Sequence, residues 1–479
     1  METVNVTING DKFAVEQGST ILEAARANGV YIPTLCHFQG IEGRANCRMC
    51  VVEVEGMRTF QPSCVTKVRD GMVINTDTER VRDARKNTLQ LILAHHAVDC
   101  HHCLRIGSSS EENLDPYFCE MCFWCDCVRD GFCELQSLAR EYHVDVLPYI
   151  QHEADYEEDR SLGSITRNPN KCIKCRRCVD VCGKVQTVHN LSMAYRGRDI
   201  MVLPEMGNTM KNSSCVRCGH CVDVCPTGAI YMSEHIDEVL TEAHGYSEDA
   251  VAQVSDTVIP VLAQLYKVDE NQITGEKICA ALHRNGFSRV ISDDHAKAVA
   301  ASQAAAIIEK NVGHGTVILS NSSAVKNFVE KFFPGLKDQI HLYDSPQEVF
   351  RELAGDLGCN KPVKTVSITD VKELGAEGEE TGDVDYVMNG RELYRMFLRS
   401  GGVPWKRRPE PFDKVWDDGE MPYAELLSDR KWSLSDEIEE TSITVNGKKC
   451  KCATARNLGQ VRKLLEGSYR EYDVVRLQA

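Results

Sequence analysis

Cysteine spacing constrains this chain more than any other feature, because 19 of its 23 cysteines lie between Cys36 and Cys225. Two stretches repeat the pattern C-x2-C-x2-C-x3-C. The eight cysteines of this doubled motif are Cys172, Cys175, Cys178, Cys182, Cys215, Cys218, Cys221 and Cys225. Three thiolates two residues apart on a tight loop can bind one [4Fe–4S] cube, while the fourth is carried toward a neighbouring cube. The motif predicts two cubes and a chain that conducts electrons.

The crossing of the fourth cysteine assigns the ligands of each predicted cube. One cube takes Cys172, Cys175, Cys178 and Cys225. The other takes Cys215, Cys218, Cys221 and Cys182. A pair of zinc ribbons is the alternative interpretation, but three evenly spaced cysteines with a distant fourth are typical of cubes.

The first residues predict a small sheet with one helix. Residues 3–8 and 12–16 alternate as strands do, on either side of a hairpin signal at Asn9-Gly10. Thr20 and Glu23 then form a capping box that opens a short helix. Two strands and a helix ahead of a cysteine-rich loop favour the ferredoxin-like β-grasp sheet.

That loop supplies the next four cysteines, which are Cys36, Cys47, Cys50 and Cys64. Ten, two and thirteen residues separate them, whereas plant-type ferredoxins begin with gaps of four and two. Four thiolates fit a [2Fe–2S] cluster. A four-cysteine zinc site is the alternative, although such sites usually combine two close pairs.

A third cysteine-rich stretch follows a helical pattern at about 78–96. His96 precedes the pair Cys100 and Cys103, and Cys133 closes the stretch. Between them lie four thiols within nine residues, which are Cys119, Cys122, Cys125 and Cys127. A further iron–sulfur cluster or a zinc ion suits these four, with spare structural cysteines as the alternative.

Composition narrows the classes of function. The chain has 479 residues, enough for several domains, and its 55 Lys+Arg against 71 Asp+Glu argue against nucleic acid as a partner. No apolar run approaches the length of a membrane span, and the first residues have no basic and apolar leader. We therefore expect a protein of the reducing cytoplasm that binds metal through its thiols and does not enter a membrane.

The composition and pattern of the sequence change at about residue 233, where cysteine becomes rare. Apolar runs at 317–319 and 363–368 are typical of buried strands, and helical patterns occupy 323–333 and 390–399. This alternation predicts an α/β domain. The whole chain is therefore expected to be α+β and multidomain.

The order of these parts resembles the front half of [FeFe]-hydrogenases, and the large iron–sulfur subunit of respiratory complex I begins in a similar way. Residues 271–290, Lys326–Pro334 (KNFVEKFFP) and Asp383–Met396 (DVDYVMNGRELYRM) are similar to the hydrogenase catalytic domain. No molybdopterin-type domain of the complex I kind is evident. The resemblance covers nearly the whole chain.

The resemblance also implies a [4Fe–4S] cluster with a histidine ligand. In the family this site is H-x3-C-x2-C-x5-C followed by Leu-Gln, and His96, Cys100 and Cys103 match its start. The last gap has 29 residues here, but Cys133 is followed by Glu-Leu-Gln and restores the ending. We assign His96, Cys100, Cys103 and Cys133, with the insertion looped between them. Five residues separate Cys127 from Cys133, as in the last gap of the family motif, so Cys127 is the rival for the place of Cys103.

Departures from the family determine the expected chemistry. In [FeFe]-hydrogenases, cysteines in three motifs of the catalytic domain hold the H-cluster, where protons are reduced. Here Ser320–Ala324 (SNSSA) stands at the first motif, Ser367–Lys372 (SITDVK) stands at the second, and the third has no counterpart before Ala479. Serine cannot replace a thiolate that bridges soft iron sites. The resemblance therefore implies a hydrogenase-like body without the active-site cluster and without catalytic residues.

Four domains are expected on this basis. They are a [2Fe–2S] ferredoxin-like domain at 1–78, a histidine- and cysteine-ligated domain with a cysteine-rich insertion at 79–155, a two-[4Fe–4S] ferredoxin domain at 156–232 and a hydrogenase-like α/β domain at 233–479. The expected cofactors are one [2Fe–2S] cluster, three [4Fe–4S] clusters and a further cluster or zinc at Cys119–Cys127.

A body of this kind resembles the electron-transfer subunit of flavin-based electron-bifurcating oxidoreductases. The resemblance implies as partners an NADH-binding flavoprotein subunit with FMN and NAD(P), a small [2Fe–2S] subunit, ferredoxin, and a separate hydrogenase or formate dehydrogenase subunit. The chain itself has no G-x-G-x-x-G after a strand and no phosphate-binding loop. The alternatives are a self-sufficient hydrogenase with an atypical active site, a complex I-like NADH dehydrogenase subunit, and a scaffold with structural zinc.

Overall fold

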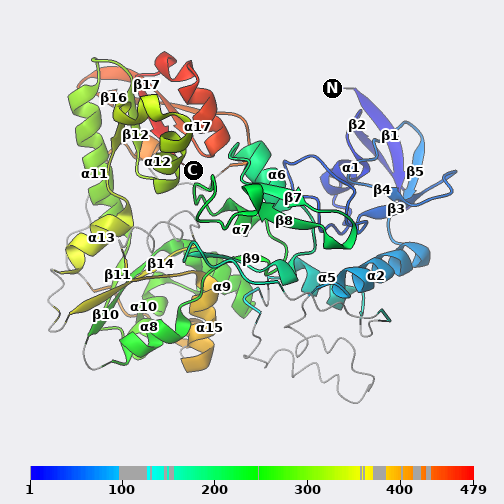
Figure 1. Cartoon of the computed structure of the whole chain (residues 1–479), viewed down its shortest axis with the longest axis horizontal. Helices are drawn as coiled ribbons and strands as arrows, with labels where there is room; N and C mark the ends of the chain where they lie inside the picture. The colour runs from blue at the N-terminus through cyan, green and yellow to red at the C-terminus, as the bar shows by residue number, and fades with distance from the viewer. Residues whose placement is uncertain are drawn as a thin grey trace.

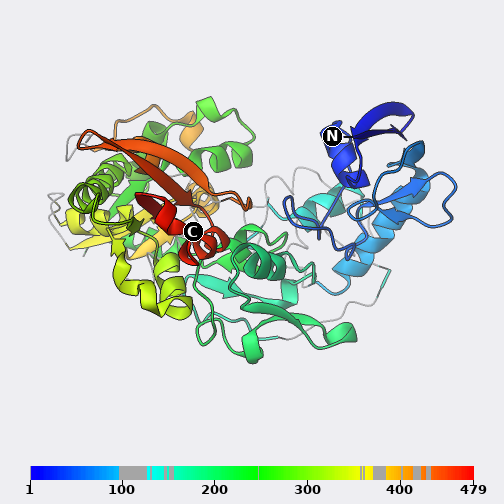
Figure 2. The ribbon, with the colours of Figure 1, turned by 90° about the horizontal axis from the view of Figure 1, so that it is seen from above.

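The structure is a computed structural model. It describes residues 2–96, 127–129, 132–144, 148–149, 156–245, 248–355, 359, 362–370, 384–400, 403–413, 422–427 and 433–478. Figure 1 shows the N-terminal sheet at one end of the molecule, a central ferredoxin-like part, and two α/β lobes at the other end. The view from above keeps the same order (Figure 2).

The N-terminal part is a five-stranded sheet with the order β2-β1-β5-β3-β4. Its strands are β1 (Thr3–Ile8), β2 (Asp11–Glu16), β3 (Val51–Val54), β4 (Gln61–Pro62) and β5 (Met72–Asn75). Strand β1 pairs antiparallel with β2 and parallel with β5. This mixed sheet carries α1 (Ile21–Ala27) on its buried face, with Ile21 and Leu22 fully buried.

The predicted start of α1 is confirmed. The Thr20 hydroxyl accepts a hydrogen bond from the Glu23 backbone N–H at 3.1 Å, and the Glu23 carboxylate accepts one from the Thr20 N–H at 2.6 Å. The two bonds satisfy donors that a helix start leaves open. The hairpin at Asn9-Gly10 is confirmed as well, because Ile8 pairs directly with Asp11.

Two helices connect the sheet to the centre of the molecule, α2 (Glu79–Leu93) and α5 (Glu134–Glu141). Arg85 of α2 is 2% exposed and joins them to β3. Its guanidinium donates to the Val51 carbonyl at 2.8 Å, to the Thr76 carbonyl at 3.0 Å and to the Tyr142 hydroxyl at 3.0 Å. The buried charge is thus paired with oxygens from three segments.

The central part is built from two short antiparallel pairs and two short helices. The pairs are β6 (Ile165–Arg167) with β9 (Ile230–Met232), and β7 (Leu191–Ala194) with β8 (Met201–Pro204). Helix α6 (Arg177–Asp180) continues as a π-turn, η3 (Val181–Val185), and α7 (His220–Asp223) follows the second cysteine loop. The two halves therefore repeat a loop followed by a helix.

The first C-terminal lobe has a parallel sheet with the order β11-β10-β14-β15. Its strands are β10 (Asp249–Val254), β11 (Arg289–Ser292), β14 (Val363–Ile368) and β15 (Tyr386–Met388). Its helices are α8 (Ile236–Ala243), α9 (Ile259–Tyr266), α10 (Gly275–Arg284) and α15 (Gly390–Ser400). Apolar side chains from the sheet and these helices form one core.

The second lobe has a sheet with the order β13-β12-β18-β17-β16, parallel except for the β16–β17 hairpin. Its strands are β12 (Val317–Ser320), β13 (Ile340–Leu342), β16 (Glu439–Val445), β17 (Lys448–Ala455) and β18 (Val474–Leu477). Its helices are α11 (Asp294–Asn311), α12 (Ser323–Phe332), α13 (Pro346–Ala354), α16 (Ala424–Leu427) and α17 (Leu458–Leu465). Strands β12 and β14 and helices α12 and α15 confirm the four segments expected from the sequence.

Short 3₁₀ turns connect these elements. They are η2 (Pro169–Lys171), η4 (Gly197–Asp199), η5 (Glu205–Gly207), η6 (Asp256–Val258), η7 (Glu270–Gln272), η8 (Pro334–Gln339), η9 (Pro404–Lys406) and η10 (Ser468–Glu471). Among the described residues, no helix combines the length and the apolar character that a membrane span requires.

Candidate iron–sulfur sites

The two cysteine loops of the central part have the same backbone geometry. Lys174 and Arg176 in the first loop have positive φ angles of 58° and 72°, and Arg217 and Gly219 have angles of 66° and 75° at the equivalent places in the second. The left-handed conformation is unfavourable for residues with a side chain, so it marks positions that the surroundings fix. It curls each loop around its sulfurs.

This loop conformation points backbone N–H groups toward the cysteine sulfurs. The Lys174 N–H lies 3.4 Å from the Cys172 sulfur, and the Arg217 N–H lies 3.4 Å from the Cys215 sulfur. Hydrogen bonds of this kind to ligand sulfurs are one means by which proteins raise a cluster's potential. The two loops therefore offer the same donor pattern.

Four sulfurs from both loops meet at one cavity. It is lined by Cys172, Cys175, Cys178 and Cys225, together with apolar side chains such as Val202 and Ile230. The last cysteine of the second motif thus lies with the first three of the first motif. The set is the one that the crossing rule assigns to the first cube.

The second set is also brought together. The thiols of Cys218, Cys215 and Cys182 are the charged neighbours that most strongly raise the pKa of Cys221, after burial. Cys182 reaches the second loop from η3, one turn beyond α6. The fourth cysteine of the first motif therefore faces the second loop.

The environment of these eight sulfurs suits iron. Burial raises the pKa of Cys172 and of Cys215 to about 11. Burial followed by neighbouring thiols raises the pKa of Cys178 and Cys221 still further. Free thiolates are costly in such apolar places, but coordination to a metal deprotonates a thiol outright. Buried sulfurs around an apolar cavity fit an iron–sulfur cube.

The four cysteines of the N-terminal loop form a second kind of site. The backbone N–H groups of Cys36 and Cys47 each lie 3.4 Å from the other residue's sulfur. A hydrogen bond from the Cys47 thiol lowers the pKa of Cys36 to about 6, and one from Cys50 lowers that of Cys64. Cys64 also lies near the charges of Cys36 and Cys47. The four sulfurs are therefore neighbours, as a [2Fe–2S] cluster requires.

Gly43 is part of this loop because no side chain fits there. A Cβ on Gly43 would lie 2.2 Å from the Cys64 carbonyl oxygen and 3.2 Å from the Cys64 Cβ. The backbone at 43 therefore packs directly against a ligand-bearing residue. The sequence contains no signal for this contact.

The third predicted site is described only in part. His96 follows the end of α2, and Cys133 is the N-cap of α5, where its sulfur accepts a bond from the Gln136 N–H at 3.4 Å. Burial, and to a lesser extent the nearby Cys127 sulfur, raise the pKa of Cys133 to about 12. Cys127 and Cys133 therefore influence each other electrostatically. The other cysteines of this stretch, which are Cys100, Cys103, Cys119, Cys122 and Cys125, lie outside the described residues.

The N-terminal loop docks on the central part next to the first cube site. The Arg44 guanidinium forms an ion pair with Asp180 at the end of α6, with Nε 3.0 Å from the carboxylate. The Asn46 side chain donates to the Lys174 carbonyl at 2.9 Å. Two predicted cluster sites are therefore held against each other.

The second C-terminal lobe docks on the second cube site. Lys331 of α12 donates to the carbonyls of Ser213 at 3.1 Å and Cys215 at 2.7 Å. The Asn327 side chain donates to the Val216 carbonyl at 3.5 Å. Both residues belong to KNFVEKFFP, so the motif that resembles hydrogenases is also the face that covers a cysteine loop.

The first C-terminal lobe reaches the cysteine-rich stretch through Arg391 of α15. Its side chain is buried and donates to the Cys127 carbonyl at 2.8 Å. Arg129 donates to the Cys225 carbonyl at 2.7 Å. The segment around Cys127 therefore lies between α15 and the first cube site.

Ser320, Ser322 and Ser367 lie in the segments that we expect to replace two hydrogenase cysteine motifs, and their hydroxyl groups bond within the protein. Ser320 ends β12 fully buried, and its hydroxyl donates to the Leu477 carbonyl at 2.9 Å. Ser322 caps α12 by accepting the Val325 N–H at 3.3 Å. Ser367 of β14 accepts a bond from Gln347 at 3.1 Å. These side chains serve strand ends and a helix cap.

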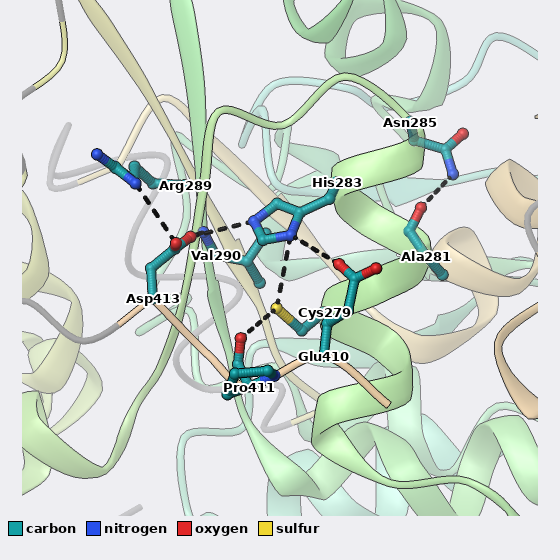
Figure 3. Close-up of polar contacts among 9 residues, drawn as sticks. All are labelled: Cys279, Ala281, His283, Asn285, Arg289, Val290, Glu410, Pro411 and Asp413. Atoms are coloured by element: carbon teal, nitrogen blue, oxygen red, sulfur yellow. Dashed lines mark hydrogen bonds and ion pairs between the residues drawn. The ribbon is translucent and has the colours of Figure 1, made fainter. Parts of the chain in front are cut away.

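The cysteines of the lobes have other neighbours. Cys279 of α10 donates to the Pro411 carbonyl at 3.4 Å, beside His283 (Figure 3). The His283 ring contacts Glu410 at 3.4 Å and Asp413 at 3.1 Å. Among the described residues, no three or more His, Cys, Asp or Glu side chains are arranged to hold a single metal ion. We interpret the group as a polar clasp that fastens residues 410–413 to α10.

Comparison with known proteins defines the class. Residues 1–79 match a 2Fe-2S iron-sulfur cluster binding domain, and residues 171–229 match a 4Fe-4S dicluster domain. Residues 248–475 match the iron only hydrogenase large subunit, C-terminal domain. The protein is an iron–sulfur protein with a hydrogenase-like C-terminal domain.

The similar proteins are of two kinds. The chain is 32% identical over 427 residues to the NADP-reducing hydrogenase subunit HndD of Solidesulfovibrio fructosivorans, a match over 83% of this chain and 69% of that protein. It is 32% identical over 203 residues to the mitochondrial NADH-ubiquinone oxidoreductase 78 kDa subunit of Candida albicans, over 42% of this chain but 25% of that protein. A solved NAD+-reducing [NiFe]-hydrogenase aligns with a TM-score of 0.40 and 23% identity, over 48% of this chain and 87% of that one.

The chain belongs to the family of hydrogenase-type iron–sulfur subunits that HndD represents, since the match with that protein spans most of both chains. Its front half is shared with the large iron–sulfur subunit of complex I.

Proposed function

We propose that this chain is the iron–sulfur electron-transfer subunit of an electron-bifurcating oxidoreductase in the cytoplasm. It relays electrons between a partner NAD(P)-linked flavoprotein and ferredoxin or another catalytic subunit. The observation that carries this proposal is the grouping of buried sulfurs from distant parts of the chain, with Cys225 beside Cys172, Cys175 and Cys178. Adjacent sulfur groups are what a chain of electron carriers needs.

Each sulfur group has a proposed occupant. Cys36, Cys47, Cys50 and Cys64 hold a [2Fe–2S] cluster, and the crossed sets at Cys172–Cys225 hold two [4Fe–4S] clusters. When bound, these clusters accept and donate single electrons at potentials set by charge, hydrogen bonds and exposure. The chain's own residues fix the sulfurs, exclude water and supply N–H donors. The four domains follow the boundaries 1–78, 79–155, 156–232 and 233–479.

The third [4Fe–4S] cluster is assigned to His96, Cys100, Cys103 and Cys133. Cys100 keeps its place four residues after His96. Cys127, whose thiol contributes to the raised pKa of Cys133, remains the rival for the place of Cys103. Cys119, Cys122, Cys125 and Cys127 would hold the additional cluster or zinc ion of the insertion.

The C-terminal lobes serve, in this proposal, as a docking body without an H-cluster. Support comes from Ser320 and Ser367, whose hydroxyl groups bond to neighbouring protein groups in the segments that we expect to replace cysteine motifs. Further support comes from Lys331, which binds the Cys215 carbonyl and so attaches the second lobe to a cysteine loop. FMN, NAD(P) and the terminal reaction belong to partner subunits.

The test is anaerobic purification of the full chain from its native host. We expect a brown protein rich in iron and sulfide, with paramagnetic iron–sulfur signals after reduction, that co-purifies with a flavoprotein and a small [2Fe–2S] subunit. A hydrogenase or formate dehydrogenase subunit in the same complex would identify the terminal reaction. A colourless zinc protein would contradict the proposal and support a structural scaffold.

A further inference from the structure

One buried arginine touches three of the proposed cluster sites. Arg177 is the first residue of α6, between Cys175 and Cys178, and only 4% of it is exposed. It follows Arg176, whose positive φ of 72° turns the chain into the helix. Burying a charged side chain this deeply costs desolvation free energy, which hydrogen bonds and an opposite charge must offset.

The side chain reaches beyond its own loop. Its guanidinium binds both oxygens of Glu134, at 2.6 and 2.8 Å, and Glu134 directly follows Cys133. It also lies over the ring of Phe38, 5.7 Å from the ring centre, in the loop that carries Cys36 and Cys47. Arg177 therefore connects the N-terminal site, the first cube site and the Cys133 site.

The charge acts on sulfurs at two of these sites. Arg177 interacts electrostatically with Cys175 of its own loop and with Cys47 of the N-terminal loop. An arginine side chain is effectively always protonated, and the paired bonds with Glu134 stabilise this charge inside the protein. The positive charge is therefore permanent.

One donor of the guanidinium remains available. The Nε–H is buried and has no acceptor among the described residues of the protein. Glu134 takes up both terminal nitrogens, so the bidentate pair does not satisfy Nε. A cluster's sulfurs are acceptors that the protein chain alone does not supply.

We propose that Arg177 is a positioning residue that raises the reduction potentials of the clusters meeting at it, while Glu134 lowers them. Reduction adds one negative charge to a cluster, so a nearby buried cation stabilises the reduced form. Glu134 is 44% exposed on its side chain, so water screens it more than Arg177. The net effect of the pair is therefore positive. This inference rests on the proposed function, because it requires clusters at these sites.

The test compares Arg177→Gln with Glu134→Gln in the full chain, by redox titration followed by electron paramagnetic resonance. We expect Arg177→Gln to lower the ratio of reduced to oxidised cluster at a fixed potential, and Glu134→Gln to raise it. A tenfold change corresponds to about 59 mV for a one-electron couple. Arg177→Lys keeps the charge but not the paired geometry, so its ratio should lie between those of the wild type and Arg177→Gln.

Arg456→Gln is the matched control. Arg456 is 11% exposed on its side chain and binds Glu439 through two nitrogens, and further hydrogen bonds join it to Gln460 and Gln478 of the same lobe. It should leave every potential unchanged. If Arg177 only held the parts together, Arg177→Gln and Glu134→Gln would both lose iron, or would shift the reduction potentials in the same direction. Either result would overturn the inference.

The outcomes separate this inference from the function it rests on. If the wild type shows no iron–sulfur signals, the proposed function fails. If the wild type is loaded with clusters and neither variant shifts a potential, only the role of Arg177 fails. If Arg177→Gln loses its clusters, Glu134→Gln decides alone, since the opposite sign is expected there and no change would count against the inference.

Discussion

At the scale of the residue, the most specific feature is the exchange of cysteines between the two loops. Cys225 joins the first three cysteines of the other motif around one cavity, and Cys182 approaches Cys215 and Cys221. The sequence motif predicts this exchange because the fourth cysteine lies on a helix that leads away from its own loop. Each site therefore depends on both halves of the central part.

Paired serine substitutions test the exchange. Cys182→Ser and Cys218→Ser should damage the same cube, so a chain with both changes should lose no more iron than a chain with one. Cys182→Ser with Cys175→Ser should lose about twice as much, because two cubes are affected. Iron and sulfide analysis of the purified chains measures this. Additive losses from the first pair would contradict the crossed assignment.

Glu392 of α15 is a buried carboxyl that should make stability depend on pH. Burial, partly offset by the Asn389 N–H at 2.9 Å and the His235 N–H at 3.1 Å, raises the pKa of Glu392 to about 8. An unfolded glutamate titrates near pH 4.3. Between these values the folded state binds more protons, so stability falls as the pH rises.

Glu392→Gln should remove this fall. The thermal midpoint of the wild type should decrease from about pH 5 to above pH 8 more steeply than that of the variant, as followed by circular dichroism. Glu352→Gln, at an exposed position of α13, is the control and should keep the wild-type profile. Parallel profiles for the wild type and Glu392→Gln would contradict the prediction.

At the scale of the element, loops hold the sulfurs and helices join the sites. The N-terminal loop binds α6 through Arg44 and Asp180, and α12 binds the second cysteine loop through Lys331. These contacts make each cysteine loop part of an interface. A change in a loop should therefore damage its own site before it damages the fold.

Gly43→Ala tests this for the N-terminal loop. The new Cβ would lie 2.2 Å from the Cys64 carbonyl oxygen, so the backbone must shift, at a cost of about 1–3 kcal/mol. We expect the [2Fe–2S] signal to weaken or disappear while the cubes remain. Gly335→Ala, with no atom near its Cβ position, is the control. Loss of all clusters together would show that the damage is not local. An unchanged [2Fe–2S] signal would show that the loop tolerates the side chain, and either result would contradict the prediction.

The sequence predicts local features well and distant contacts poorly. The capping box at Thr20 and the strand at 363–368 follow from spacing over a few residues, and both are confirmed. The contacts of Arg177 with Glu134 and of Arg391 with Cys127 join residues 43 and 264 positions apart. No short-range pattern encodes them, because they depend on how the parts pack. The exception is the doubled cysteine motif, which predicts that Cys225 meets the first three cysteines of the other loop.

At the scale of the whole molecule, the predicted sulfur sites form a connected series. The N-terminal site lies against the first cube site. Each of the two cube sites takes one cysteine from the other loop, and α12 covers the second cube site. The lobes lie at the opposite end of the molecule from the N-terminal sheet (Figures 1 and 2). Such an order suits the transfer of electrons from a partner at one end to a partner at the other.

We propose that this hydrogenase-like chain carries electrons but does not make hydrogen. The most direct test is hydrogen evolution from reduced viologen by the full chain, loaded with clusters and produced in a host that makes active [FeFe]-hydrogenases. We predict no turnover above the background, in a sample whose iron–sulfur signals appear on reduction. Sustained hydrogen production that is proportional to protein concentration would contradict the account.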